Sequence, residues 1–160
     1  MKSGFFYILF IIFENKKKQF YVQFYTTIPL WLGVPCFTCF IIAVVNSLIG
    51  FTSKKEFTAK DRKIALFALI GIHTQLLIGL ILYFVSPLGF QQLGEMKIAA
   101  IRLTSLEHPL INLIAIVLIT IGWSKHKKLI NSEAKFKTFA IFYGLGLVLI
   151  LSRIPWKLWL

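Results

Sequence analysis

The sequence predicts an all-α integral membrane protein, an antiparallel bundle of four transmembrane helices. Hydrophobic residues make up 58% and charged residues 15% of the 160 residues, whereas ordinary globular domains have about 45–50% and about 25%. The mean hydropathy is +0.78, and the apolar residues form blocks that short, lysine-rich stretches separate. The length allows only about four or five crossings of about 20 residues each, which excludes a large transporter with two repeated halves and any Rossmann or barrel enzyme.

The placement of the charges supports the same fold class. The net charge is +12, from 18 Lys and Arg against 6 Asp and Glu, but the basic residues fall between or beyond the apolar blocks, so we expect no nucleic-acid partner. A charge at the bilayer centre costs about 2.5–3.5 kcal/mol on the insertion scale, so a chain that spans the membrane needs apolar blocks without charged residues. Within residues 26–160 we predict spans at about 28–51, 65–85, 106–123 and 137–154.

Local signals mark where these helices begin. Thr58 followed by Asp61 has the spacing of a capping box before the second span, and Asn131 precedes the fourth span as an N-cap. Pro109 favours a local opening or a helix start, from which the third span extends back as a partly interfacial helix. Residues 1–25 fit less well, because the apolar run at 4–13 rises only about 15 Å, half of a hydrocarbon core. We therefore expect this segment to be an interfacial helix, a truncated signal-like segment or an over-extended start.

The basic residues also predict the orientation of the chain. The stretches after the first and third spans hold five basic residues each, and the stretch after the second span and the C-terminal tail hold two each. Because basic loops stay on the cytoplasmic side, we expect residues 52–64 and 124–137 in the cytoplasm, where they would contact anionic membrane lipid.

His73 is the strongest single candidate for a functional residue. It lies about ten residues into the second helix, roughly 15 Å below the cytoplasmic edge, and an ionisable side chain at that depth indicates a functional site. His108 opens the third span about 21 Å above the same edge. The two depths differ by roughly 6 Å, which a helix tilt of about 20° reduces. The pattern thus permits, without demonstrating, a haem iron bound by both imidazoles.

The polar residues near these histidines have two interpretations. Glu107 would orient His108 directly or through a neighbouring helix, as in metal-bound histidines, while Asn112 and Gln75 would set the polarity around a cofactor. In the alternative, a neutral His73 bonds to a neighbouring helix, for example to Asn46 or Asn112, and the polar residues only pack the helices together.

Other candidates carry less functional information. His126 lies among Lys125, Lys127 and Lys128 and is expected to be solvated. Cys36 and Cys39 are expected to be small residues that face other helices, because thiols at this spacing in a helix are poorly placed for a disulfide. The sequence shows no nucleophile–base pair, phosphate loop or HExxH motif, so we do not expect an enzyme on its own.

Three segments carry a resemblance: HTQLLIGLILYF at 73–84, EHPL at 107–110 and IPW at 154–156. Over about residues 43–157 the chain resembles short four-helix membrane proteins of Bacteroidota that are labelled cytochrome b or left uncharacterised. The resemblance implies a bacterial inner-membrane protein that binds haem b and transfers electrons, with His73 and His108 as iron ligands. At residues 26–33 the chain reads TTIPLWLG, where the family has a histidine-containing segment.

Two other functions remain open from the sequence. One is a non-enzymatic membrane subunit or scaffold without haem, which would assemble with a membrane protein partner or as a homo-oligomer. The other is a conduit for protons or small solutes that uses His73, because intramembrane histidines occur in proton relays.

Overall fold

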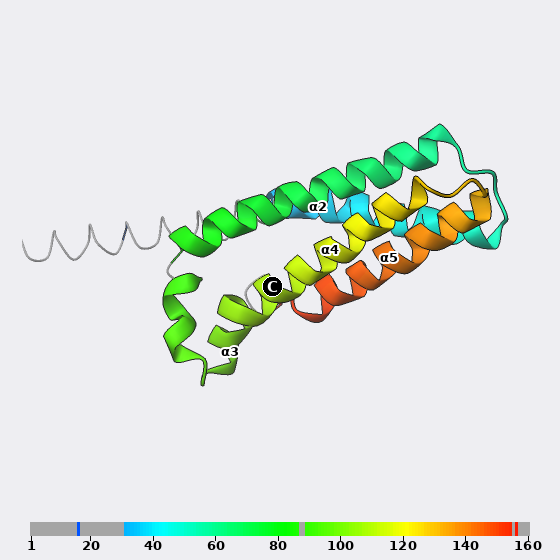
Figure 1. Cartoon of the computed structure of the whole chain (residues 1–160). Helices are drawn as coiled ribbons and strands as arrows, with labels where there is room; N and C mark the ends of the chain where they lie inside the picture. The colour runs from blue at the N-terminus through cyan, green and yellow to red at the C-terminus, as the bar shows by residue number, and fades with distance from the viewer. Residues whose placement is uncertain (1–15, 17–30, 87–88, 155, 157–160) are drawn as a thin grey trace, which may run out of the picture.

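The computed structural model describes residues 16, 31–86, 89–154 and 156 (Figure 1), and these residues form helices and no β-strand. Four helices are long and apolar enough to cross a membrane. They are the first helix, Trp31–Thr52, followed by α2, Ala59–Val85, the segment Ala99–His126, and α5, Ser132–Ser152. The predicted all-helical class and the four apolar helices are therefore confirmed.

The capping residues define the helix starts as the sequence predicts. The backbone N–H and the hydroxyl of Thr58 both donate to Oδ2 of Asp61, at 2.9 and 2.6 Å, so α2 begins at Ala59. The Asn131 side chain accepts from the N–H of Glu133 at 2.9 Å and caps α5. Both helices therefore begin earlier than the predicted spans. The interpretation of residues 1–25 concerns positions outside the described residues, apart from Lys16.

The third apolar segment is interrupted by a wider turn before Pro109. A 3₁₀ helix, η1 (Phe90–Glu95), is followed by α3 (Ala99–Arg102), a π-helical turn, η2 (Leu103–Glu107), and α4 (His108–His126). Pro109 has no N–H to donate to the carbonyl of Ser105 four residues earlier, and a π turn accommodates such a gap. The Tyr83 hydroxyl of α2 donates to this carbonyl at 2.8 Å. The predicted opening at Pro109 is thus present as a π turn, and helix extends back from it to Ala99.

The packed core lies in one half of the molecule. In Figure 1, α2 and α4 lie close together near the loops at 53–58 and 127–131 and diverge toward α3. The buried residues follow this arrangement, since they occupy the first half of α2, residues 115–126 of α4 and residues 136–146 of α5. The buried apolar side chains of these three stretches are Ala65, Ala68, Ile72, Ala115, Ile116, Ile119, Trp123, Phe136, Phe139 and Tyr143.

His126 belongs to this core, so the prediction of a solvated loop residue is wrong. The residue is 3% exposed, and its Nδ1–H donates to the carbonyl of Trp123. Its ring centroid lies 4.5 Å from that of Trp123 and 4.6 Å from that of Phe139. Because α4 continues through His126, the side chain shares the inward face of Ile119 and Trp123 rather than the exposure of its lysine neighbours.

Candidate functional site

His73 contacts α4 through one ring nitrogen and its own helix, α2, through the other. Nδ1 donates to the carbonyl of Leu69 at 2.8 Å, and Nε2 lies 3.2 Å from Oγ1 of Thr120 in α4. A carbonyl only accepts, so Nδ1 carries the hydrogen and Nε2 offers its lone pair to the hydroxyl. Thr120 Oγ1 also donates to the carbonyl of Ile116 at 2.8 Å, so the carbonyl and the imidazole compete for its one hydrogen. The interhelical partner is Thr120, rather than the asparagines considered from the sequence.

His108 joins the beginning of α4 to the end of α5. Its Nδ1–H donates to the carbonyl of Arg153 at 2.7 Å, and its Nε2 accepts from Nδ2 of Asn112 at 3.0 Å. Asn112 lies one helical turn after His108, so the two side chains share a face of α4. Both imidazole nitrogens of His108 are therefore bonded within the chain.

Glu107 acts on His108 only through the neighbouring helix. Its Oε1 accepts from Nε of Arg102 at 2.9 Å, and its Oε2 lies 3.6 Å from Nη1 of Arg153. Arg153 is the residue whose carbonyl accepts from His108. Of the two arrangements considered from the sequence, the structure thus has the indirect one. Arg102 and Arg153 were not predicted as site residues, although each is a rare charge close to an apolar span.

The two amides expected around a cofactor lie in different surroundings. Asn112 donates to His108, while its Oδ1 is buried and has no hydrogen-bond partner in the described part of the chain. Gln75 packs against the first helix, where its Nε2 would lie 3.1 Å from a Cβ placed on Gly33. Gln75 therefore contributes to the contact between α2 and the first helix, away from the His108 network.

The structure does not bring the two histidines together. His73 is bonded to Thr120, which follows His108 by twelve residues in α4, a distance of about 18 Å along the helix. Two imidazoles on one metal ion have their nitrogens about 4 Å apart, since each metal–nitrogen bond is about 2 Å. One iron bound by both histidines does not fit this arrangement. Among the described residues, no group of three or more His, Cys, Asp or Glu is placed to hold a metal ion.

The two cysteines differ in their surroundings. Cys36 is partly buried against α2, where its Sγ would lie 3.4 Å from a Cβ on Gly71. Cys39 is exposed, and both thiols are free. The expectation of an inward-facing small residue is therefore confirmed for Cys36 and wrong for Cys39.

The carboxylate of Asp61, predicted only as part of a helix cap, lies at the centre of a larger polar cluster. Asp61 is 3% exposed, and its Oδ1 accepts from Nδ2 of Asn46 at 3.0 Å and from Nζ of Lys55 at 3.1 Å. Its Oδ2 accepts both bonds from Thr58. These four residues, the Asp61 cluster, connect the first helix, the following loop and α2. The signal for it was the presence of Asn46 on the inward face of the first helix, close to a basic loop.

The described residues thus define a helical protein with four apolar helices, two separate histidine sites and the Asp61 cluster. Comparisons with protein-family models, with curated proteins and with solved structures give no match for this chain.

Proposed function

We propose that this protein is a non-enzymatic subunit of the bacterial inner membrane, inserted as an antiparallel four-helix bundle with residues 52–64 and 124–137 in the cytoplasm. The observation that supports this function is the use of both imidazoles in contacts between helices. His73 bonds to Thr120 and His108 bonds to Arg153. In hydrocarbon, a polar group needs a partner inside the protein. The side chains that could otherwise bind a cofactor therefore serve to hold α2, α4 and α5 together.

The outward faces of the helices fit a subunit that associates within the membrane. The second half of α2 exposes large apolar side chains, including Leu77 at 62%, Ile81 at 64% and Phe84 at 62%. Gly79 lies on the other side of α2, and a Cβ added there would also meet nothing within 4 Å. Transmembrane helices associate by packing their exposed faces together, so the second half of α2 suits a helix of a membrane protein partner or of a second copy.

Substitution of the histidines tests the proposed function. His73→Ala and His108→Ala are each expected to lower the free energy of unfolding by about 1–2 kcal/mol, because each removes a bond between helices in hydrocarbon. The absorption spectrum of the protein should not change. Thr74→Ala, at an exposed position next to His73, is the matched control and should leave stability unchanged. Reversible unfolding in mixed micelles measures the effect, and histidine variants as stable as the Thr74→Ala control would contradict the proposal.

A haem-binding electron carrier is the second candidate, and the hydrogen bonds of the imidazoles favour it. In both histidines Nδ1–H donates to a backbone carbonyl, which leaves Nε2 with the lone pair, as in metal-bound histidines. Haem b, when bound, would supply one-electron transfer. Each iron would have only one of these histidines as a ligand, and Thr120 or Asn112 would have to release the Nε2 atom.

An optical spectrum separates the two candidates. Under the proposed subunit function, protein purified after haem-replete expression shows no Soret band, oxidised or reduced, because the Nε2 atoms of His73 and His108 stay bonded to Thr120 and Asn112. A Soret band at stoichiometric intensity that His73→Ala or His108→Ala abolishes, and that Thr74→Ala retains, would overturn the subunit function in favour of an electron carrier.

A further inference from the structure

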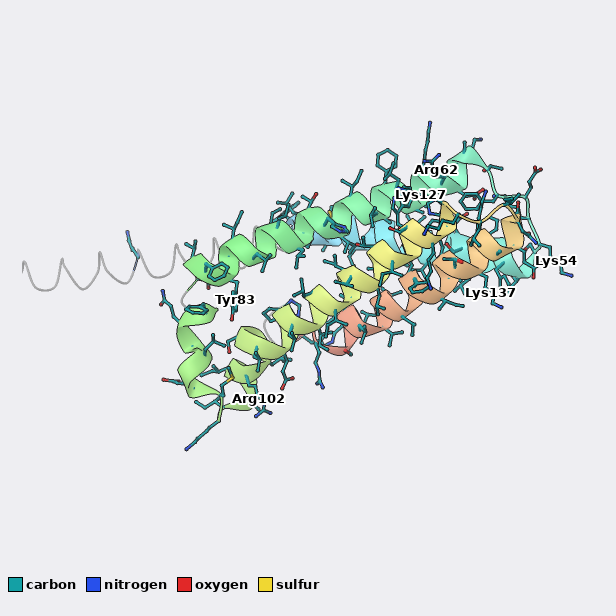
Figure 2. The ribbon with its side chains drawn as sticks, in the orientation of Figure 1. Lys54, Arg62, Tyr83, Arg102, Lys127 and Lys137 are labelled. Atoms are coloured by element: carbon teal, nitrogen blue, oxygen red, sulfur yellow. The ribbon has the colours of Figure 1, made fainter. Side chains whose placement is uncertain are left out.

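Ten basic side chains gather at one end of the molecule, and we call this set the basic end. The two loops that carry them are joined, since the N–H of Phe57 donates to Oγ of Ser132 at 3.0 Å and the Phe57 ring packs against that of Phe136 at 5.0 Å. Figure 2 shows four members of the set around this end, with Arg102 at the opposite end. The basic end comprises Lys54, Lys55, Lys60, Arg62, Lys63, Lys125, Lys127, Lys128, Lys135 and Lys137.

Few of these charges are compensated. Three acidic residues accompany them, namely Glu56, Asp61 and Glu133, which leaves a net charge of +7. Within the described part of the chain, the pair of Lys55 with the buried Asp61 is the one salt bridge at this end. At the opposite end, Arg102 and Arg153 both pair with Glu107. This end therefore carries +7 of the net charge of +12.

The basic side chains lie where lipid headgroups would meet the helices. Several occupy terminal turns of the helices rather than loop tips, and three ammonium groups lie over aromatic rings. Lys125 lies 4.9 Å from the Phe142 ring centroid, Lys127 5.3 Å from that of Trp123 and Lys135 5.4 Å from that of Phe57. Such contacts hold a lysine stem along apolar surface while its charge stays at the polar boundary.

Lys125 also has apolar surface directly below it. Ile121 lies one helical turn deeper on the same face of α4 and is 38% exposed. On α5, Leu145 continues from Phe142 and is 52% exposed. A positive group with exposed apolar side chains beneath it matches a phospholipid, whose phosphate lies above its acyl chains.

From this arrangement we infer that the basic end binds the headgroups of anionic phospholipids. The protein therefore binds anionic phospholipids at this end in preference to phosphatidylcholine. The inference rests on the proposed membrane insertion and not on whether the protein binds haem. Each lysine near an anionic bilayer contributes about a fivefold preference, so removing four of them should lower the preference at least tenfold.

Lipid selectivity of the full chain in vesicles tests this inference. The protein is reconstituted in phosphatidylcholine containing increasing phosphatidylglycerol, and quenching of tryptophan by the brominated form of either lipid gives their relative binding constants. The test variant carries Lys54→Gln, Lys63→Gln, Lys128→Gln and Lys137→Gln. A second variant with arginine at the same four positions keeps the charge, and Lys97→Gln removes an exposed lysine from the opposite end. Flotation in pure phosphatidylcholine reports membrane insertion independently of lipid selectivity.

The inference predicts that the natural chain, the arginine variant and Lys97→Gln all prefer phosphatidylglycerol, and that the glutamine variant loses at least tenfold of this preference. The preference should weaken as salt is added, and inorganic phosphate at matched ionic strength should not compete. An equal preference for phosphatidylglycerol in the natural chain and in the glutamine variant would overturn the inference. A loss of this preference in Lys97→Gln as large as that in the glutamine variant would also overturn it. Competition by inorganic phosphate would also overturn it, since a free anion would then be the ligand. Failure to float with phosphatidylcholine would instead overturn membrane insertion.

Discussion

Replacing Asp61 by alanine is expected to lower the free energy of unfolding by about 2–4 kcal/mol, more than any histidine substitution. The side chain is 2% exposed, whereas that of Lys55 is 50% exposed, so the salt bridge itself contributes little. The loss comes from the buried hydrogen bonds. Alanine removes the acceptor for Asn46 and for both groups of Thr58, and with it the cap of α2 and the connection to the first helix.

Two further variants separate these contributions. Asp61→Asn keeps an oxygen that can accept from Thr58, so we expect a smaller loss, of about 1–2 kcal/mol. Glu133→Ala removes an exposed acid from the first turn of α5 and should change stability by less than about 0.5 kcal/mol. Unfolding in mixed micelles followed by circular dichroism measures all three. If Asp61→Ala proved no less stable than Glu133→Ala, the Asp61 cluster would not hold these helices together.

Gly50→Ala is expected to destabilise the protein by about 2–3 kcal/mol. A Cβ at this position would lie 2.3 Å from a ring carbon of Phe136, closer than any real contact. The ring is 0% exposed and packs against Phe57 at 5.0 Å, so it has no space into which to move. The first helix must then shift away from α5.

The chain offers matched controls for this substitution. A Cβ added at Gly79 of α2 or Gly144 of α5 meets nothing within 4 Å. Because alanine favours a helix over glycine by up to about 1 kcal/mol, both substitutions should leave stability unchanged or raise it slightly. Thermal unfolding of the three variants in the same detergent compares them. A Gly50→Ala protein that unfolds at the same temperature as Gly144→Ala would contradict the close contact of the first helix with α5.

The sequence predicted the helices and their capping residues because those depend on local chemistry. The capping residues Thr58 and Asn131 precede their helices, and Pro109 accompanies a change in helical geometry, whatever the neighbouring helices do. The surroundings of His126 are different. Its lysine neighbours indicated a solvated residue, but the helical repeat of Ile119 and Trp123 continues to it and predicts an inward position. The helical periodicity was the better signal, because the face of the helix on which a residue lies determines its burial more strongly than charged neighbours in the sequence do.

The pairing within the candidate site could not be predicted from depth alone. Counting residues from the membrane edges places His73 and His108 within roughly 6 Å in depth, on the assumption that the helices are parallel and end in common planes. In the structure α2 and α4 diverge (Figure 1), and His73 lies beside Thr120 instead. Helix rotation and crossing angle decide which side chains meet, and neither is encoded in the spacing of one helix.

Because the buried side chains shared by α2 and α4 lie toward one end of both helices, any rotation of α2 against α4 would turn about that end. A small rotation there becomes a larger displacement farther along, near η1 and α3, because displacement grows with distance from the pivot. The bond from Tyr83 to the carbonyl of Ser105 crosses between the two arms at that far end and limits how widely they spread. A proline that frees one carbonyl thus supplies the point at which α2 is attached to the third apolar segment, far from the core.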